Sequence, residues 1–139
     1  MQEDKEPVFD ACDTVKACLD IFRGMVSTLT ANTDKMREAA GKGFINATDY
    51  ADYLVGKGLP FRDAYKIAGK TVRLCEQNGC TLGTLPIDDY VKICPLVEKD
   101  VYEAVDLDNC VSRRKSEGGT CVRSVEKQIK FVKDFLKTV

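Results

Sequence analysis

Histidine and tryptophan are absent from this sequence of 139 residues, and proline occurs only four times. Without histidine, the chain cannot form a mixed cysteine–histidine zinc site or a nucleophile activated by an imidazole. No sign of charge predominates, because 21 basic and 22 acidic residues leave a formal net charge of -1. Nucleic-acid binders need a basic surface, and a membrane span needs roughly 18 consecutive apolar residues. We therefore expect neither a nucleic-acid partner nor a membrane partner.

The cysteines are odd in number and none belongs to a CxxC pair. They are Cys12, Cys18, Cys75, Cys80, Cys94, Cys110 and Cys121. Scattered in this way, cysteines are more typical of small buried apolar residues than of metal ligands. We expect reduced thiols in a cytoplasmic protein, with no metal site, no cofactor and no catalytic cysteine.

Apolar residues at helical spacing are abundant, beginning close to the start of the chain. Steps of three and four residues separate Val8, Ala11, Val15, Cys18, Phe22, Met25 and Leu29. Such a heptad pattern is typical of a helix that packs along other long helices. It predicts one long helix, in which Pro7 either suits the first turn or marks a kink in a helix already begun.

Shorter helices separated by glycine and proline are expected after residue 32. Asn32 or Thr33 can cap a helix that ends near Gly41, and Asn46 can cap the next one. The polar residues around Asn46 are Thr48, Asp49 and Asp52, and we interpret this cluster as capping rather than ligand contact.

A longer helix is predicted to begin at Pro60 and to end at Gly79. Its predicted buried face comprises Phe61, Ala64, Tyr65, Ala68, Val72 and Cys75. Helices or turns follow at about 86–93, 97–105 and 107–114, with Cys94-Pro95 as a break. Arg113, Arg114 and Lys115 are interpreted as a solvated helix end.

A last helix is predicted after Thr120, which can cap it, and its apolar residues again step by three and four. No strand-like alternation competes, so the predicted class is all-α. The C-terminal helix is the one partner of comparable length that the chain offers to its first helix. Either copies of the chain assemble, or the chain is the tail of a longer protein that contains other long helices.

Four stretches resemble the C-terminal part of argininosuccinate lyase, a family of the aspartase/fumarase superfamily. They are MQEDKEPVFDACDTVK, TANTDKMREAAGKGFINATDYADYLVGKGLPFRDAYKIAGK, CPLVEKDVYEAV and SRRKSEGGT. The chain departs from the family's usual residues at Tyr65, at Cys94 and at Cys121-Val122. These departures leave the resemblance intact, and put in doubt only a role assigned to those positions.

The resemblance implies a chain that begins well inside the family's protein and covers its last third. Residues 1–31 would form the C-terminal long helix of the central helical-bundle domain, and residues 32–139 the small helical C-terminal domain. Members of the family are homotetramers that split argininosuccinate into arginine and fumarate by β-elimination, in arginine biosynthesis.

The resemblance also assigns a substrate-binding role to Gln2 and Lys5 of the QEDKE stretch. These residues are three apart and would share a face of a helix. An amide and an ammonium group together suit an amino-acid carboxylate and its neighbours, and in the family the matching residues contact the arginine-like end of the substrate. The alternative is a solvated helix start, where Glu3, Asp4 and Glu6 are favourable.

No catalytic residue is expected in this chain. β-Elimination needs a base and an acid, and in the family the base is a serine on a loop of pattern GSSxMPxKxNP, assisted by a histidine from another subunit. The chain has neither, so we expect it to be inactive by itself, although the parent protein would be a carbon–nitrogen lyase. An alternative is a non-catalytic helical assembly or binding module of the same ancestry, as in the related lens crystallins.

Overall fold

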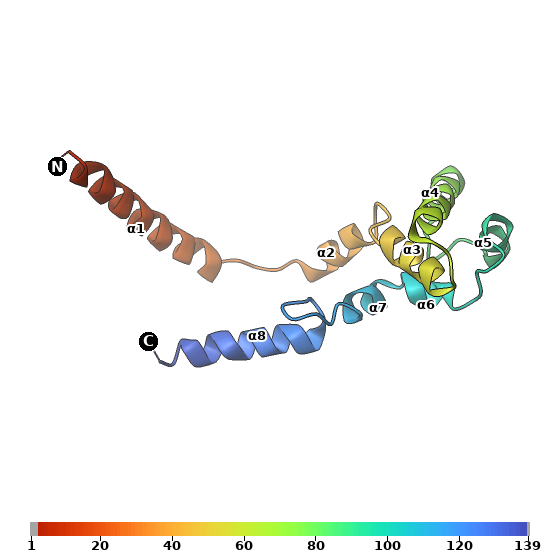
Figure 1. Ribbon diagram of the computed structural model, residues 1–139. Helices are drawn as coiled ribbons and strands as arrows, with labels where there is room; N and C mark the ends of the chain where they lie inside the picture. The colour runs from red at the N-terminus through yellow and green to blue at the C-terminus, as the bar shows by residue number, and fades with distance from the viewer. Residues whose placement is uncertain (1–2, 139) are drawn as a thin grey trace. The chain divides into compact units, whose positions relative to one another are not determined.

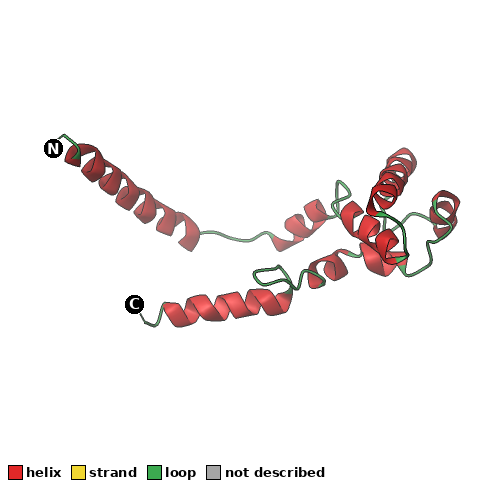
Figure 2. Cartoon of the chain, viewed as in Figure 1, coloured by secondary structure: helices red, strands yellow, loops and turns green. Residues whose placement is uncertain are grey.

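A computed structural model describes residues 3–138, and all regular secondary structure in that range is helical (Figure 2). The helices are α1 (Lys5–Ser27), α2 (Thr33–Ala40), α3 (Ala47–Gly56), α4 (Phe61–Asn78), α5 (Ile87–Ile93), α6 (Val101–Val105), α7 (Leu107–Ser112) and α8 (Val122–Phe135) (Figure 1). The all-α prediction is therefore confirmed, with one long first helix followed mostly by shorter ones. Within the described range, no helix combines the length and the apolar character needed to cross a membrane.

The chain divides into two compact units, one that ends at Arg37 and one that begins at Glu38. The first unit contains α1, an uninterrupted helix of 23 residues (Figure 1). It ends before residue 31, which is earlier than predicted. Near its end the hydroxyls of Ser27 and Thr28 donate to the carbonyl of Gly24, at 2.8 and 3.1 Å. Hydroxyl side chains that bond the preceding turn compete with continued helix.

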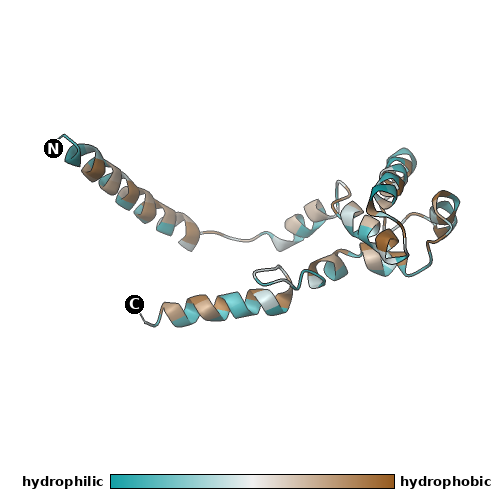
Figure 3. Cartoon of the chain, viewed as in Figure 1, coloured by the Kyte–Doolittle hydropathy of each residue, from teal (hydrophilic) through white to brown (hydrophobic). Residues whose placement is uncertain are grey.

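The heptad residues of α1 form an exposed apolar stripe. No described residue of α1 is buried, and the exposed fractions of Val15 and Phe22 are 56% and 62%. Colouring by hydropathy shows apolar positions recurring along the length of the helix (Figure 3). The stripe that the sequence predicted is present, and it is uncovered.

The second unit has its hydrophobic core around α3 and α4. Helix α3 packs against α4 and α6, α4 also packs against α5, and α6 packs against α7. The larger fully buried side chains include Tyr50, Leu54, Leu82, Leu85, Tyr90, Val101 and Val105. The core therefore draws residues from the middle of the chain, between the two helices with the heptad patterns.

Two tyrosines connect helices of this core to the loop after α4. The hydroxyl of Tyr90 on α5 donates to the carbonyl oxygen of Leu82 at 2.7 Å. The hydroxyl of Tyr102 on α6 donates to the carbonyl oxygen of Leu85, also at 2.7 Å. The rings of Tyr90 and Tyr102 meet edge to face, with centroids 6.2 Å apart. These bonds satisfy backbone carbonyls that a loop would otherwise leave unpaired.

The predicted bounds of α4 are confirmed, but part of its predicted buried face is wrong. Ala64, Ala68, Thr71 and Cys75 are buried, whereas the exposed fractions of Phe61 and Tyr65 are 56% and 68%. Tyr65 follows Ala64 by one residue, which turns its side chain by about 100° around the helix axis. Phe61 lies in the first turn, and its ring contacts that of Tyr65 with centroids 6.2 Å apart.

Two predicted helix caps are also wrong. Asn46 precedes α3, but its side chain makes no capping bond there. Its amide nitrogen instead donates to the carbonyl oxygen of Val105 at 2.6 Å, which ties the start of α3 to the end of α6. Helix α8 begins one residue later than a Thr120 cap would place it, with Cys121 as the residue before the first turn.

Candidate functional site

The two residues predicted to bind substrate stand at the start of the first unit. Gln2 lies outside the described residues, so its predicted role has no structural test. Lys5 is the first residue of α1, and its side chain is exposed. Helix α1 therefore begins at Lys5. The residues between Gln2 and Lys5 precede this helix, although the prediction placed Gln2 and Lys5 on one helical face.

The start of α1 carries side chains of both charge signs, with Lys5 flanked by Asp4 and Glu6. The unpaired N–H groups of a first helical turn carry a partial positive charge, which stabilises an anion nearby. Lys5 adds a full positive charge at the same end, and Asp4 before it makes no capping bond with its side chain. Asp4 and Glu6 can themselves supply the negative charge that this helix end favours.

An ion pair that the sequence analysis missed lies in the second unit. Arg114 Nη2 donates to both carboxylate oxygens of Asp49, at 2.8 and 3.0 Å. Asp49 on α3 is only 5% exposed, whereas the side chain of Arg114, after α7, is about half exposed. The interpretation of Arg114 as part of a solvated helix end is wrong, because its guanidinium pairs with the Asp49 carboxylate. That carboxylate is buried, and a buried charge requires a partner. The interpretation of Asp49 as a capping residue is likewise replaced by this pairing.

A small cavity of about 230 Å³ adjoins this ion pair. Asn46, Asp49, Cys110 and Arg114 contribute to its wall. Burial first and the Asp49 carboxylate second raise the pKa of the Cys110 thiol to about 11. The thiol is therefore kept protonated, which makes it a poor nucleophile.

A second ionic cluster joins the end of α3 to the segment before α6. Lys57 Nζ lies 2.6 Å from Glu98 Oε2 and 2.9 Å from Asp100 Oδ2. The Tyr53 hydroxyl donates to Asp100 Oδ1 and accepts the backbone N–H of Glu98 at 3.1 Å. Hydrogen bonds from Tyr53 and from Lys57 lower the pKa of Asp100, in that order of importance. Each charge in this cluster has a partner, so the cluster serves to hold the segment.

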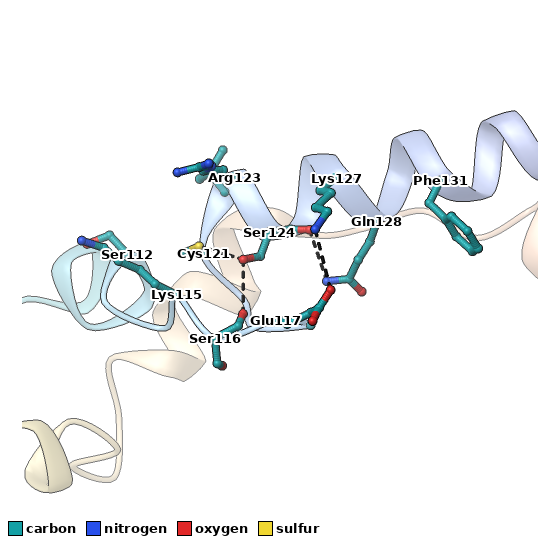
Figure 4. A pocket seen from close by; sticks show the side chains of 12 residues that line it. Ser112, Lys115, Ser116, Glu117, Cys121, Arg123, Ser124, Lys127, Gln128 and Phe131 are labelled. Carbon is teal, nitrogen blue, oxygen red and sulfur yellow. Dashed lines mark hydrogen bonds and ion pairs between the residues drawn. The ribbon is translucent and has the colours of Figure 1, made fainter.

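A groove of about 860 Å³ lies between the 112–121 segment and α8 (Figure 4). The Ser124 hydroxyl lies between the Cys121 thiol and the carbonyl oxygen of Ser116, at 3.2 and 3.4 Å. Farther along α8, Lys127 lies 3.7 Å from the exposed carboxylate of Glu117. The groove has cationic and hydroxyl groups, but among the described residues it contains no arrangement of base and acid suited to elimination.

The described residues thus contain structural ion pairs, and they bring no catalytic pair together. Asp49 and Arg114 could not be matched from sequence because 65 residues separate them. The one sign of this ion pair in the sequence was the position of Asp49, directly before Tyr50 and Ala51. Both of these residues are buried, and a carboxylate buried beside them needs a paired charge.

Comparison with known proteins gives a consistent family match. The family model described as "Argininosuccinate lyase C-terminal" matches residues 44–112. That segment runs from the residues before α3 to the end of α7, and so contains the core of the second unit.

Curated relatives extend the match over nearly the whole chain. An argininosuccinate lyase of Geotalea daltonii is 48% identical over 133 residues, which are 96% of this chain and 29% of the relative. Those of Pelotomaculum thermopropionicum and Nitratidesulfovibrio vulgaris are 47% and 50% identical over 137 and 129 residues, or 99% and 93% of this chain. The chain spans 30% and 28% of the length of these two relatives.

Proposed function

The chain belongs to the argininosuccinate lyase family, and on that premise we propose that it supplies the C-terminal part of an enzyme that cleaves argininosuccinate into arginine and fumarate. The observation that carries the proposal is the similarity over more than nine tenths of the chain to relatives named for that activity. In this proposal the chain contributes substrate contacts and assembly surfaces, and the groups that transfer protons lie elsewhere in the parent protein.

Lys5 is the substrate-binding residue whose placement supports this proposal most directly. It stands in the first turn of α1 with its side chain exposed. Its ammonium group and the helix end together favour an anionic group such as the carboxylate of an amino acid. Gln2 is proposed as its partner, with an amide that can both donate and accept.

The isolated chain is proposed to be inactive. It contains no histidine, and it lacks the glycine-rich serine loop that supplies the base in the family. Substrate contacts alone bind the ground state and the transition state alike, which does not accelerate the chemical step.

Assembly is the second contribution that we propose. The apolar stripe of α1 is uncovered in the described chain, and it has the period of a helix that packs along long neighbours. Copies of the parent protein would cover it in the homotetramer that is typical of the family.

A chimera tests the proposal. The C-terminal part of the Geotalea daltonii relative that aligns with this chain is replaced by this chain, and fumarate release from argininosuccinate is followed by absorbance. We expect activity from the chimera and none from the isolated chain. Lys5→Met in the chimera should lower kcat/KM about 100-fold, because a charge-assisted hydrogen bond is lost.

Lys16→Met is the matched control, since Lys16 is an exposed lysine of α1 that pairs with Asp13 at 3.3 Å. It should leave kcat/KM within about threefold of the chimera's value. A chimera that folds and assembles without activity would contradict the proposed function, and would favour a non-catalytic module. Equal losses for the two lysine variants would contradict the role of Lys5.

A further inference from the structure

The C-terminal end of α4 has a cap that brings two cysteines together. The backbone N–H of Cys80 donates to the carbonyl oxygen of Cys75 at 3.0 Å, and that of Gly79 donates to Glu76 at 3.3 Å. Gly79 is left-handed, with φ of 62°. This pair of bonds around a left-handed glycine is the Schellman motif, in which the side chains of the first and last residues often contact each other.

The end of α3 has the same motif with a different pair of side chains. There the N–H of Leu59 donates to Leu54 at 3.2 Å, and that of Gly58 donates to Val55 at 2.9 Å, with Gly58 at φ of 100°. The paired positions are thus two leucines at α3 and two cysteines at α4. Two thiols can fill the apolar role of the leucines, but they can also react with each other.

The two thiols differ in their access to solvent. Cys75 is fully buried, whereas Cys80 is half-buried. Burial first and the neighbouring Cys80 thiol second raise the pKa of Cys75 to about 12, as expected for two side chains that the cap bond from Cys80 N–H to the Cys75 carbonyl brings near each other. A reagent in solution therefore meets Cys80 first.

We propose that Cys75 and Cys80 are an oxidisable dithiol that forms a disulfide across the C-terminal cap of α4. The oxidant is a small disulfide such as oxidised glutathione. The Cys80 thiolate attacks one sulfur of the small disulfide, whose S–S bond breaks and releases one small thiolate. Cys75 then loses its proton and attacks the Cys80 sulfur, which forms the protein disulfide and releases the second small thiolate. The two protons end on the released thiols, so two protein thiols are oxidised and one small disulfide is reduced to two thiols.

The cap geometry favours the second step. Cys75 does not need access to the oxidant, because its target is the sulfur of a side chain that the cap places beside it. Such held proximity raises the effective concentration of one reactant at the other, and offsets the low thiolate content of a buried thiol. The bond would fasten the end of α4 to the segment that contains Leu82, whose carbonyl accepts the Tyr90 hydroxyl.

Peptide mapping tests the proposal on the full chain. The exposed Cys12 and Cys18 are first replaced by serine, so that α1 cannot form disulfides between molecules. The folded protein is treated with oxidised glutathione, the remaining thiols are alkylated in denaturant, and the protein is digested with trypsin. Both cysteines fall in the single tryptic peptide of residues 74–92.

We expect this peptide to carry no alkyl group and to be lighter by about 2 Da than its reduced form, because disulfide formation removes two hydrogens. Cleavage after Glu76 should then leave two halves that separate only on reduction. Buried Cys94 and Cys110, which occupy no such cap, should be recovered alkylated.

Cys80→Ser provides the matched control, and it should leave Cys75 fully alkylated. Circular dichroism during the treatment verifies that the chain stays folded. Recovery of the 74–92 peptide with two alkyl groups, under conditions that fully oxidise Cys12 and Cys18 of the unsubstituted chain, would overturn the proposal. Recovery with glutathione on Cys80 and an alkyl group on Cys75 would overturn it as well.

Discussion

Arg114 Nη2 lies 2.8 Å from one carboxylate oxygen of Asp49 and 3.0 Å from the other, across 65 residues of sequence. The contact joins the first turn of α3 to the segment that follows α7. Asn46 makes a second connection at the same end of α3, through its bond to Val105. Together these bonds fix where the chain leaves the core of the second unit on its way to α8.

Replacing Arg114 with alanine should destabilise the second unit. The substitution leaves the carboxylate of Asp49, which is 5% exposed, without its partner. Breaking a fully buried pair costs roughly 3–5 kcal/mol. Because the Arg114 side chain is 46% exposed, water can partly replace it, and we expect a loss of about 2 kcal/mol. Urea unfolding followed by circular dichroism measures the difference.

Arg113→Ala is the control for this prediction, since it removes a neighbouring exposed arginine of the same charge. Its expected effect is within about 0.5 kcal/mol. In an Asp49→Asn background the cost of Arg114→Ala should shrink, because the buried charge is gone. Equal costs for the two arginines would show that the ion pair contributes nothing specific.

The tyrosine core offers a second comparison, between two buried hydroxyls. The hydroxyl of Tyr90 donates to Leu82, whereas that of Tyr50 is buried and makes no hydrogen bond of normal geometry in the described chain, although the Thr71 side chain is near enough to offset part of the rise in pKa that burial causes. Tyr90→Phe should therefore cost about 1–2 kcal/mol, because it leaves a carbonyl unsatisfied. Tyr50→Phe should be neutral or stabilising by up to about 1 kcal/mol. Denaturant midpoints of the two variants decide the point, and a larger loss for Tyr50→Phe would refute it.

The parts of this fold that sequence predicts well are those set by local chemistry. Pro60 and Gly79 bracket α4 because proline suits a helix start and glycine adopts the left-handed cap. The Cys94-Pro95 break ends α5 for the reason expected, since Cys94 is extended. The stripe of α1 was likewise visible as a heptad pattern.

The parts that sequence predicts poorly depend on which face meets which neighbour. Phe61 and Tyr65 were assigned to the core by their helical spacing, but α4 presents its small residues to the rest of the unit. Asn46 and Arg114 bond to partners far along the chain, and no local pattern specifies those partners. The candidate site was predicted from resemblance alone, because an exposed lysine at a helix start is common to many unrelated helices.

Replacing Gly119, in the loop before α8, is predicted to destabilise the chain. A Cβ atom added at Gly119 would lie 2.3 Å from the backbone oxygen of Arg114 and 2.8 Å from that of Ser116. Backbone atoms cannot yield as a flexible side chain can, so the loop must open. Gly119→Ala should cost about 2 kcal/mol in unfolding free energy, within the range of overpacked sites.

Gly69→Ala on α4 is the control for Gly119→Ala, because an added Cβ there meets no atom within 4 Å. Alanine is the better helix former by about 1 kcal/mol, so this variant should be stabilised. Thermal unfolding measures both changes. A Gly119→Ala variant as stable as the parent chain would show that the close approach to Arg114 is not maintained.

Asp100 should make part of the chain's stability depend on acid pH. Bonds from Tyr53 and Lys57 lower its pKa in the folded state, below the value of about 3.9 of an unperturbed aspartate. A group with a lowered folded pKa stabilises the fold above its unfolded pKa, and loses that contribution as the pH falls through the folded value. Asp100→Asn should therefore be less stable than the parent at neutral pH, and the gap should narrow below about pH 4.

Asp52→Asn serves as the control for Asp100→Asn, because it changes an exposed carboxylate of α3 outside the Lys57 cluster. Urea unfolding at a series of pH values gives the free energies. A gap between parent and Asp100→Asn that widens in acid would have the wrong sign for this cluster.

The exposed stripe of α1 should drive self-association of the chain. Phe22 is 62% exposed on the stripe, whereas Asp20 lies on another face of the same helix. Phe22→Lys places a charge where an apolar contact between copies is expected, and burying that charge would be costly. Asp20→Lys introduces the same side chain away from the stripe.

In sedimentation over a wide concentration range, we expect the parent and Asp20→Lys to associate and Phe22→Lys to shift at least tenfold toward monomer, a change of about 1.4 kcal/mol. A parent chain that stays monomeric throughout would contradict assembly through α1, and an equal shift for both lysine variants would place the contact elsewhere on the helix.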